Sequence, residues 1–339
     1  MSSNAVRGWR RASIYDVAKV AGVSHMTVSR VLNGHPNIRE STRARVLQAI
    51  EETNYTRSSI ARALATQRAM RIGVIVDSPV HYGPNSTLRA IEGAARERGY
   101  TVSSVSFSDE EGEAVGNGVA ELVTQGVDGL CVIAPRFSSL EKIRQRAAGL
   151  PTLVIQADPV DDMHTAAVDQ RVGATLATRH LIELGHKNIL HVAGPLDWYD
   201  ARARAEAWGA TMAGSGLSAP EAVVGDWSSD SGYQIGRHQN LDGVTAIFAS
   251  NDQMALGLVH GLWDRGLRVP DDISVVGFDD LPDASHFLPP LTTVSQPFAS
   301  LGELTLTQLL AAIENEPVAD RRLIDPTLVV RESTAPPGH

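Results

Sequence analysis

The spacing of apolar residues divides the sequence into two parts near residue 71. Beyond this point, short apolar runs alternate with longer stretches in which apolar residues recur every three or four positions. The short runs predict buried strands, and the longer stretches predict amphipathic helices. Strands are expected at 72–76, 102–107, 129–134, 152–155, 189–193, 223–226, 246–249 and 273–278. Helices are expected at 85–98, 140–148, 172–184, 201–212, 232–240 and 253–263, and a further helix is expected to follow the strand at 102–107 and end at 125.

Strands that alternate with helices form parallel sheets that carry helices on both faces. A second series of strands and helices starts after Val168, so we expect an α/β protein with two Rossmann-like lobes. Ligands of such sheets bind at the carboxyl ends of the strands. When two lobes face each other, this rule places a ligand site in the cleft between them.

Residues 1–12 carry no periodic pattern, and from Ser13 the first part of the sequence has a helical period that predicts three short helices. The first begins at Ser13, which has the spacing of a capping box with Asp16. Gly22 can adopt the positive φ of a tight turn, and Ser24 is a suitable N-cap for the second helix. After a break at Gly34, His35 and Pro36, the third helix is expected at about 40–54, with Val46, Leu47 and Ile50 facing inward.

The segment 21–33 predicts the turn and second helix of a helix-turn-helix. Val28, Val31 and Leu32 form one apolar stripe. The opposite face carries groups that can reach DNA phosphates and base edges, namely His25, Met26, Ser29, Arg30 and Asn33. The alternative is an ordinary surface helix with a solvated polar face.

The distribution of charge favours DNA binding. Residues 1–71 contain twelve lysines and arginines and four acids, a net charge of +8. The rest of the chain carries a net charge of −17, which gives −9 for the whole chain. A basic region on an acidic body is typical of a nucleic-acid-binding module. Binding that depends on such charges weakens steeply with salt.

A short, alanine-rich segment follows at 57–68. A helix of this length is not stable alone in water, but it can fold in a dimer on DNA. Leu64 is then a candidate wedge for the minor groove, where inserted leucines kink the duplex. The alternative is a plain linker, with Leu64 packed against a neighbour.

Composition excludes several classes of protein. No apolar run is long enough to span a membrane, and the N-terminus lacks the apolar core of a signal peptide, so a cytoplasmic protein is expected. The single cysteine, Cys131, lies in an apolar strand-like run and is expected to be buried and inert.

Catalytic motifs and metal-ligand spacings are missing, so neither an enzyme nor a cofactor is expected. Asp279 and Asp280 are adjacent and point opposite ways on an extended segment, a poor acid/base pair.

Five motifs occur in order along the chain. They are Ile-Tyr-Asp-Val-Ala-Lys-Val-Ala-Gly-Val-Ser at 14–24, Thr-Val-Ser-Arg-Val-Leu-Asn at 27–33, Ser-Asn-Asp-Gln-Met-Ala-Leu-Gly at 250–257, Ile-Ser-Val-Val-Gly-Phe-Asp-Asp at 273–280 and Pro-Leu-Thr-Thr-Val at 290–294. Together they resemble the lactose repressor (LacI/GalR) family of transcriptional regulators. The resemblance covers about residues 13–333.

The resemblance implies a homodimer that binds a pseudo-palindromic operator, with a hinge helix and a core similar to periplasmic sugar-binding proteins. The implied boundaries are a basic tail at 1–12, a DNA-binding domain at 13–57, a hinge at 58–70, an N-terminal lobe at 71–168 with 297–325, and a C-terminal lobe at 169–296 with 326–339. The DNA-contacting residues expected are Ser24, His25, Met26, Thr27, Ser29, Arg30, Asn33 and Leu64.

The resemblance also implies a set of effector-binding residues in the cleft. Carboxylate, amide and guanidinium groups suit vicinal hydroxyls, and an aromatic ring suits the C–H face of a sugar. Each residue also has a structural alternative: a turn for Asp279, a helix cap for Asn251, the core for Trp227, and a surface charge for Arg202, with Arg204 nearby. The expected set is Asp77, Ser78, Gln156, Trp198, Arg202, Trp227, Asn251, Asp279 and Gln296.

The chain also departs from the family pattern. The hinge entry reads Tyr-Thr-Arg-Ser at 55–58 where the family usually has a proline, so the hinge is expected to order less readily. Gln156 replaces a sugar-binding aspartate of the lactose repressor, which puts a β-galactoside effector in doubt. No leucine heptad follows Arg331, so a dimer is expected. Function is expected to be repression relieved by a sugar or other small polyhydroxyl effector. The alternatives are a corepressor such as a purine, a phosphoprotein partner, or a sugar-binding protein or enzyme with no role on DNA.

Overall fold

The computed structural model describes residues 12–32, 34–55, 68–77, 81–107, 112–133, 136–147, 149–156, 163–318 and 323–338. Internal contacts divide the chain into two units, Met1–Ala69 and Met70–His339, and each is described by itself. Asn33, Leu64 and Ser78 lie outside the described residues, as does most of the expected hinge helix, and the side chain of Asp77 is not described.

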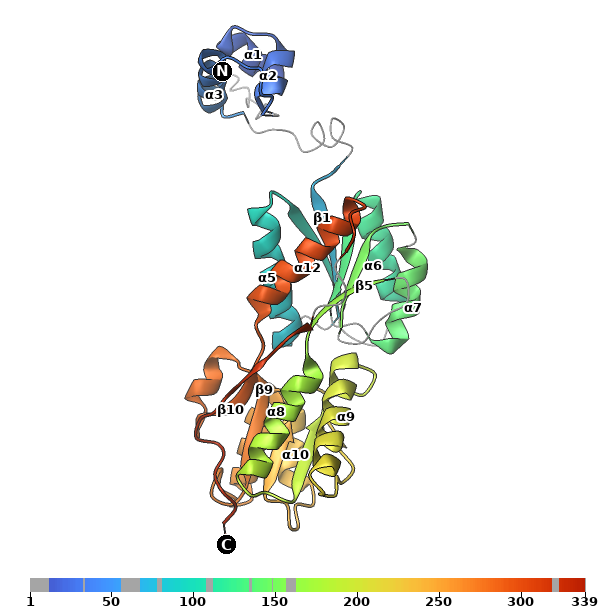
Figure 1. Ribbon diagram of the computed structural model, residues 1–339, viewed down its shortest axis with the longest axis vertical. Coiled ribbons are helices and arrows are strands. Elements are labelled where there is room, and N and C mark those ends of the chain that lie inside the picture. Colours follow the sequence, from blue (N-terminus) through green and yellow to red (C-terminus); the bar gives the residue numbers. More distant parts are fainter. Residues whose placement is uncertain are drawn as a thin grey trace, which may run out of the picture. The chain divides into compact units, whose positions relative to one another are not determined.

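The described residues of the first unit form three helices, α1 (Ile14–Ala21), α2 (His25–Leu32) and α3 (Glu40–Thr53) (Figure 1). The capping box predicted for α1 is present, since the side chains of Ser13 and Asp16 each accept a hydrogen bond from the other residue's backbone amide. Gly22 ends α1 with φ of 64°. The hydroxyl of Ser24 accepts a hydrogen bond from the amide of Thr27, 3.1 Å away, and so caps α2.

The core of this unit is small and aliphatic. Val17, Val28 and Val46 are fully buried at its centre. Leu47, which was expected to face inward, is 50% exposed, so that expectation is wrong. The buried stripe of α3 runs through Val46 and Ala49, three residues apart, and Leu47 lies about 100° around the helix from Val46.

The second unit contains two lobes, as the alternating pattern predicted. In the first lobe six parallel strands lie in the order β11-β5-β4-β3-β1-β2. The strands are β1 (Arg71–Asp77), β2 (Thr101–Phe107), β3 (Gly129–Ile133), β4 (Thr152–Ile155), β5 (His164–Val168) and β11 (Leu323–Ile324). The helices are α5 (Tyr82–Glu97), α6 (Gly112–Thr124), α7 (Phe137–Arg146) and α12 (Phe298–Ile313).

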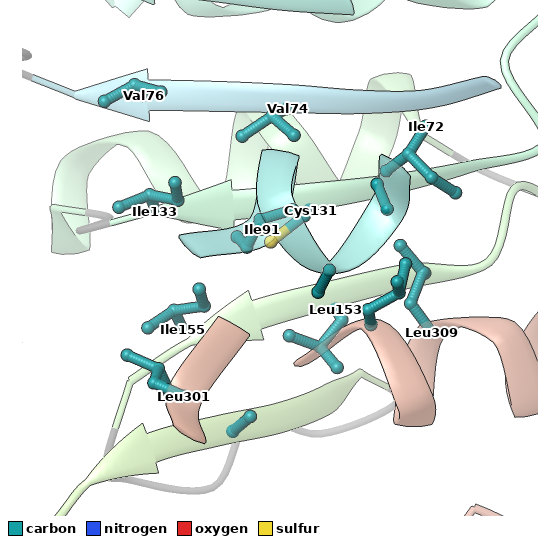
Figure 2. Packing of buried hydrophobic residues seen from close by; sticks show 14 of the residues in the cluster. Ile72, Val74, Val76, Ile91, Cys131, Ile133, Leu153, Ile155, Leu301 and Leu309 are labelled. Carbon is teal, nitrogen blue, oxygen red and sulfur yellow. The ribbon is translucent and has the colours of Figure 1, made fainter. Parts of the chain in front are cut away.

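The helices cover both faces of this sheet because side chains alternate along each strand. Ile72, Val74 and Val76 point to the face that α5 and α12 cover (Figure 2). Ile75 points to the other face, where it packs with residues of α6 and α7. Cys131 is fully buried in the first cluster, and burial raises the pKa of its thiol.

The second lobe has the strand order β12-β10-β9-β8-β6-β7, in which only β12 is antiparallel to its neighbour. The strands are β6 (Ile189–Ala193), β7 (Val223–Val224), β8 (Ala246–Ala249), β9 (Ser274–Asp279), β10 (Thr292–Ser295) and β12 (Thr327–Val329). The helices are α8 (Gln170–Glu183), α9 (Tyr199–Gly214), α10 (Ser229–His238), α11 (Asp252–Asp264) and the 3-10 helix η1 (Pro282–His286).

The chain crosses between the lobes three times in the described residues. The crossings lie between β5 and α8, between β10 and α12, and between β11 and β12 (Figure 1). The apolar pattern predicted none of β5, β10, α12, β11 and β12. These elements complete both sheets, and the crossings bring residues far apart in the sequence to the carboxyl ends of the strands.

Candidate functional site

The exposed surface of α2 carries the residues expected to contact DNA. Met26 is 58% exposed, and His25 and Arg30 are exposed beside it. Sequence reasoning missed Tyr15 of α1, which is 65% exposed and whose ring centroid lies 5.0 Å from that of His25. Of the other expected residues, Ser24 is exposed, Thr27 and Ser29 are half-buried, and Asn33 and Leu64 lie outside the described residues.

A second candidate site is a cavity at the carboxyl ends of the strands of both lobes. Its polar walls come mainly from the second lobe, where β8 is followed by Asn251 and β9 ends at Asp279. The described lining comprises His81, Gly83, Pro84, Thr87, Ile133, Ile155, Gln156, Ala167, Val168, Gln170, Trp198, Asp200, Arg204, Trp227, Asn251, Asp279, Gln296, Phe298 and Leu301.

The cavity brings together six of the nine residues expected to bind effector: Gln156, Trp198, Trp227, Asn251, Asp279 and Gln296. Arg202 does not line it. Its guanidinium lies 3.6 Å from the centre of the ring of Phe137, in α7 of the first lobe, and its Nε lies 3.9 Å from a carboxylate oxygen of Glu206. Arg204 is the guanidinium of the cavity. Arg202 and Arg204 are two residues apart on a helix, so their side chains point in directions about 200° apart. For this reason Arg204 enters the cavity and Arg202 does not.

Arg204 is held on several sides although it is almost completely buried. Its Nε donates to Oε1 of Gln170 at 2.9 Å, and its Nη1 donates to the carbonyl oxygen of Ser250. Its Nη2 lies 3.8 Å from Oδ1 of Asp279, and its guanidinium stacks 3.8 Å from the centre of the Phe278 ring. A buried guanidinium needs such partners because its desolvation is costly.

Asp279 has an unusual backbone for a non-glycine residue. Its φ is 106°, and that of Asp280 is 51°. The next residues hold this turn in place, since Oδ2 of Asp252 accepts from the amide of Leu281 at 2.8 Å and Asp280 pairs with Arg331 at 2.7 Å. Strain of this kind persists only where surrounding contacts enforce it, and it is common at functional sites.

Burial raises the pKa of Asp279 to about 6, an effect that Arg204 and the hydrogen bond from Gln296 oppose and that Asp200 adds to. Burial and the charge of Asp279 also raise the pKa of Asp252 well above its usual range. Asp279 is therefore a carboxylate at neutral pH, held between a guanidinium and an amide.

Gln170 and Gln296 connect these two charged groups. Nε2 of Gln170 donates to Oε1 of Gln296 at 3.0 Å, and Nε2 of Gln296 donates to Oδ1 of Asp279 at 2.6 Å. With the bond from Arg204 to Gln170, a continuous line of buried hydrogen bonds runs from Arg204 to Asp279.

Aromatic rings form another wall of the cavity. Trp198 and Trp227 meet edge to face, with ring centroids 5.8 Å apart. The indole ring of Trp227 packs directly on Gly194, where any side chain would collide with it. Asn251 caps α11 by accepting from the amide of Met254, and it donates to the carbonyl oxygen of Trp227 at 3.0 Å. The helix-cap alternative for Asn251 is thus observed, together with its place in the cavity.

The first lobe contributes a mainly apolar wall. Its polar lining residues are His81, Thr87 and Gln156, beside aliphatic groups such as Ile133 and Leu301. Asp77 ends β1, and its side chain is not described, while Ser78 lies outside the described residues. The structure therefore describes neither side chain.

Sequence reasoning missed Arg204, Gln170, Asp200 and His81 as lining residues. One signal was available for Arg204, because α9 buries residues 201, 204 and 208 at helical spacing. Nothing in the sequence around Gln170 marked it, since its neighbour in the network is 126 residues away.

The described part of the chain offers no cluster of three or more histidine, cysteine, aspartate or glutamate side chains that could hold a metal ion. Within the same residues, no helix combines the length and apolarity that crossing a membrane requires.

Comparisons with known proteins agree with this arrangement. Residues 13–58 match the family model described as bacterial regulatory proteins, lacI family, and residues 178–334 match a periplasmic binding protein-like domain. The lactose operon repressor of Escherichia coli (strain K12) is 35% identical over 331 residues, covering 96% of this chain and 91% of that protein. The repressor PurR of Pasteurella multocida (strain Pm70) is 35% identical over 332 residues, covering 95% and 98%.

Among solved structures, the lac repressor dimer bound to operator and the anti-inducer ONPF matches with a TM-score of 0.87 and 33% identity, covering 96% of this chain and 100% of that one. These relatives are repressors, and the similarity extends over both the helix-turn-helix unit and the two lobes. The chain therefore belongs to the lacI family of bacterial regulatory proteins.

Proposed function

We propose that this protein is a transcriptional repressor that binds operator DNA as a homodimer and releases it when a sugar or similar polyhydroxyl compound fills the cavity. The observation that carries the proposal is that one chain holds both the exposed α2 surface and a cavity with a buried Arg204–Asp279 pair. We also propose the domain boundaries stated above. Catalysis has no part in the proposed function. The protein is proposed to act in the cytoplasm, where bacterial operators lie.

For DNA binding, His25, Met26 and Arg30 are proposed to read bases in the major groove, and Ser24, Thr27 and Ser29 to contact the backbone. Asn33 and Leu64 belong to the same proposal from sequence. Arg30→Ala tests it against operator fragments obtained by in vitro selection. Binding to the selected site should weaken by about 1–3 kcal/mol more than binding to random DNA. Equal losses on both DNAs would show that Arg30 contacts only phosphates.

For the effector, Arg204 and Asp279 offer a donor and an acceptor to vicinal hydroxyls, and Trp227 offers a ring for the C–H face of a sugar. The indole N–H of Trp227 is buried and has no acceptor among the described residues, so a ligand oxygen can satisfy it. The proposed set is Gln156, Trp198, Arg204, Trp227, Asn251, Asp279 and Gln296.

A corepressor is the second candidate, and the similarity to a purine repressor favours it. Operator binding should be measured with lactose, galactose, glucose, ribose, hypoxanthine and guanine. The proposal expects a sugar to weaken operator binding by about 5–150-fold, the usual range of coupling between two sites. Tighter binding with a purine base would favour corepression.

Asp279→Ala should abolish the response to that compound while operator binding remains. Arg237→Ala is the matched control, because Arg237 is also charged but lies outside the cavity and pairs with Asp264 within the second lobe. A normal response of the Asp279 variant would refute the assignment of the cavity.

A further inference from the structure

Two of the three segments that cross between the lobes carry a buried glutamine. Gln170 follows β5 at the first crossing and is 3% exposed, and Gln296 follows β10 at the second and is 9% exposed. Their side chains are joined by the 3.0 Å hydrogen bond between Nε2 of Gln170 and Oε1 of Gln296. The two crossings are therefore tied to each other by a polar contact inside the molecule.

The direction of every hydrogen bond in this line is determined by its ends. The guanidinium of Arg204 can only donate, so Gln170 must present its carbonyl oxygen to it and its NH₂ group to Gln296. Gln296 then accepts with its own oxygen and donates to Asp279, whose carboxylate only accepts. The four groups fit together with no unfavourable pairing, and charges at both ends strengthen the bonds between them.

We propose that Gln170 is a positioning residue that transmits occupancy of the cavity to the crossings between the lobes. The proposal rests on the function proposed above, because it requires an effector that contacts Arg204 or Asp279. All four groups line the cavity, and the bond between Gln170 and Gln296 also joins two of the three described chain segments that connect the lobes.

The mechanism follows from competition for the same donors and acceptors. A ligand hydroxyl that donates to Asp279 competes with Gln296, and a ligand oxygen that accepts from Arg204 competes with Gln170. Either contact alters the polarisation and geometry of the bond between the glutamines. A ligand shifts a conformational equilibrium only through such a difference in contacts between the two states.

Two variants separate the bonds of Gln170. Gln170→Met keeps the length of the side chain and removes every hydrogen bond. Gln170→Glu keeps an acceptor for Arg204 but removes the NH₂ donor, so it breaks the bond between the crossings together with the longer 3.3 Å bond to the carbonyl oxygen of Val168. Gln308→Met is the matched control, since Gln308 of α12 is 3% exposed and neither end of its amide has a hydrogen-bond partner among the described residues.

The first experiment needs no ligand. Spin labels are attached at two exposed positions, Lys142→Cys in α7 of the first lobe and Lys187→Cys in the second lobe. They report the distance between the two lobes of one subunit, in a dimer whose other subunit is unlabelled. Cys131 is buried and does not take up label. Wild-type protein and Gln308→Met should give the same narrow distance distribution, and both Gln170 variants should broaden or shift it. Unchanged distributions in the Gln170 variants would overturn the proposal.

The second experiment measures coupling with whichever sugar of the panel weakens operator binding by the wild-type protein. Both Gln170 variants should reduce the ratio of operator Kd values with and without sugar by about two- to tenfold, the equivalent of one buried hydrogen bond. Gln308→Met should leave the ratio unchanged. A purely structural role would lower thermal stability without changing the ratio, and that result would refute the inference. If no sugar acts on the wild-type protein, the proposed function fails, while the distance measurement still decides the role of Gln170.

Discussion

Replacing Gly194 by alanine should displace the aromatic wall of the cavity. A Cβ at this position would lie within 2.5 Å of three atoms of the Trp227 indole, Cε2, Cζ2 and Cη2. Carbon atoms in contact are normally about 3.5–4.0 Å apart, so the ring must retreat by about 1 Å or more. It has little freedom to do so, because its edge meets Trp198 and the backbone of Trp227, with φ of 73°, is held by the amide of Asn251.

The expected cost follows from this geometry. Overpacking a core costs about 1–3 kcal/mol, and in a unit of this size each kcal/mol lowers the Tm by roughly 2–4 °C. The displaced ring should also lose its stacking on the sugar, about 1 kcal/mol or roughly fivefold in effector affinity. Thermal unfolding followed by tryptophan fluorescence gives the first quantity, and titration with the active sugar gives the second.

Gly209→Ala is the control for this experiment. Gly209 lies in α9, and apart from its chain neighbours and the backbone of its own helix no heavy atom of the described residues lies within 4 Å of the position that its Cβ would take. Alanine should stabilise this helix by about 0.5–1 kcal/mol and leave sugar affinity unchanged. If the two alanine variants have the same Tm and bind sugar equally well, the contact between Gly194 and Trp227 does not shape the cavity.

Three further predictions concern other groups. The raised pKa of Asp279, about 6 against 3.8 in the unfolded chain, gives stability that is present below pH 3.8 and is lost as pH rises through 6, on the order of 3 kcal/mol. Urea midpoints between pH 3.5 and 7.5 should therefore fall more steeply with pH in the wild type than in Asp279→Asn, where the raised pKa of Asp252 still contributes a slope of the same sign. Cys131 should be unreactive to Ellman's reagent until urea unfolds the chain, and a fast reaction of the native protein would contradict its burial. Ser13→Ala should destabilise the helix-turn-helix unit by about 1 kcal/mol, measured by amide hydrogen exchange in α1, whereas unchanged exchange would mean that the capping box contributes nothing.

The sequence was most informative where structure depends on neighbouring residues. The capping box at Ser13, the positive φ of Gly22 and the cap at Ser24 involve partners within four residues, and the structure shows each of them. Apart from β5, the alternation of strands and helices up to β9 was also predictable, because each element buries one side of a repeating pattern. Leu47 was misplaced because the buried stripe of α3 is set by packing against two other helices.

The cavity was predictable only in part. Its position followed from the rule for carboxyl ends of parallel strands, and residues such as Trp227 and Asp279 lie where that rule places them. The identity of its guanidinium did not follow, because Arg202 and Arg204 differ only in the direction that α9 gives them. The role of Gln170 could not be predicted either, since it depends on a crossing that brings Gln296 beside it.

The order of the strands has a consequence for protein synthesis. The first sheet is completed by β11 (Leu323–Ile324) and covered by α12, and the second sheet is completed by β12 (Thr327–Val329). Neither lobe can therefore finish folding until the ribosome has made nearly the whole chain. The three described helices of the first unit, by contrast, are synthesised first and pack against one another. A prematurely terminated chain would keep a folded helix-turn-helix unit and expose two unfinished sheets. Such a product could occupy DNA but could not respond to a ligand. Its exposed sheets make it a substrate that cellular proteases can remove.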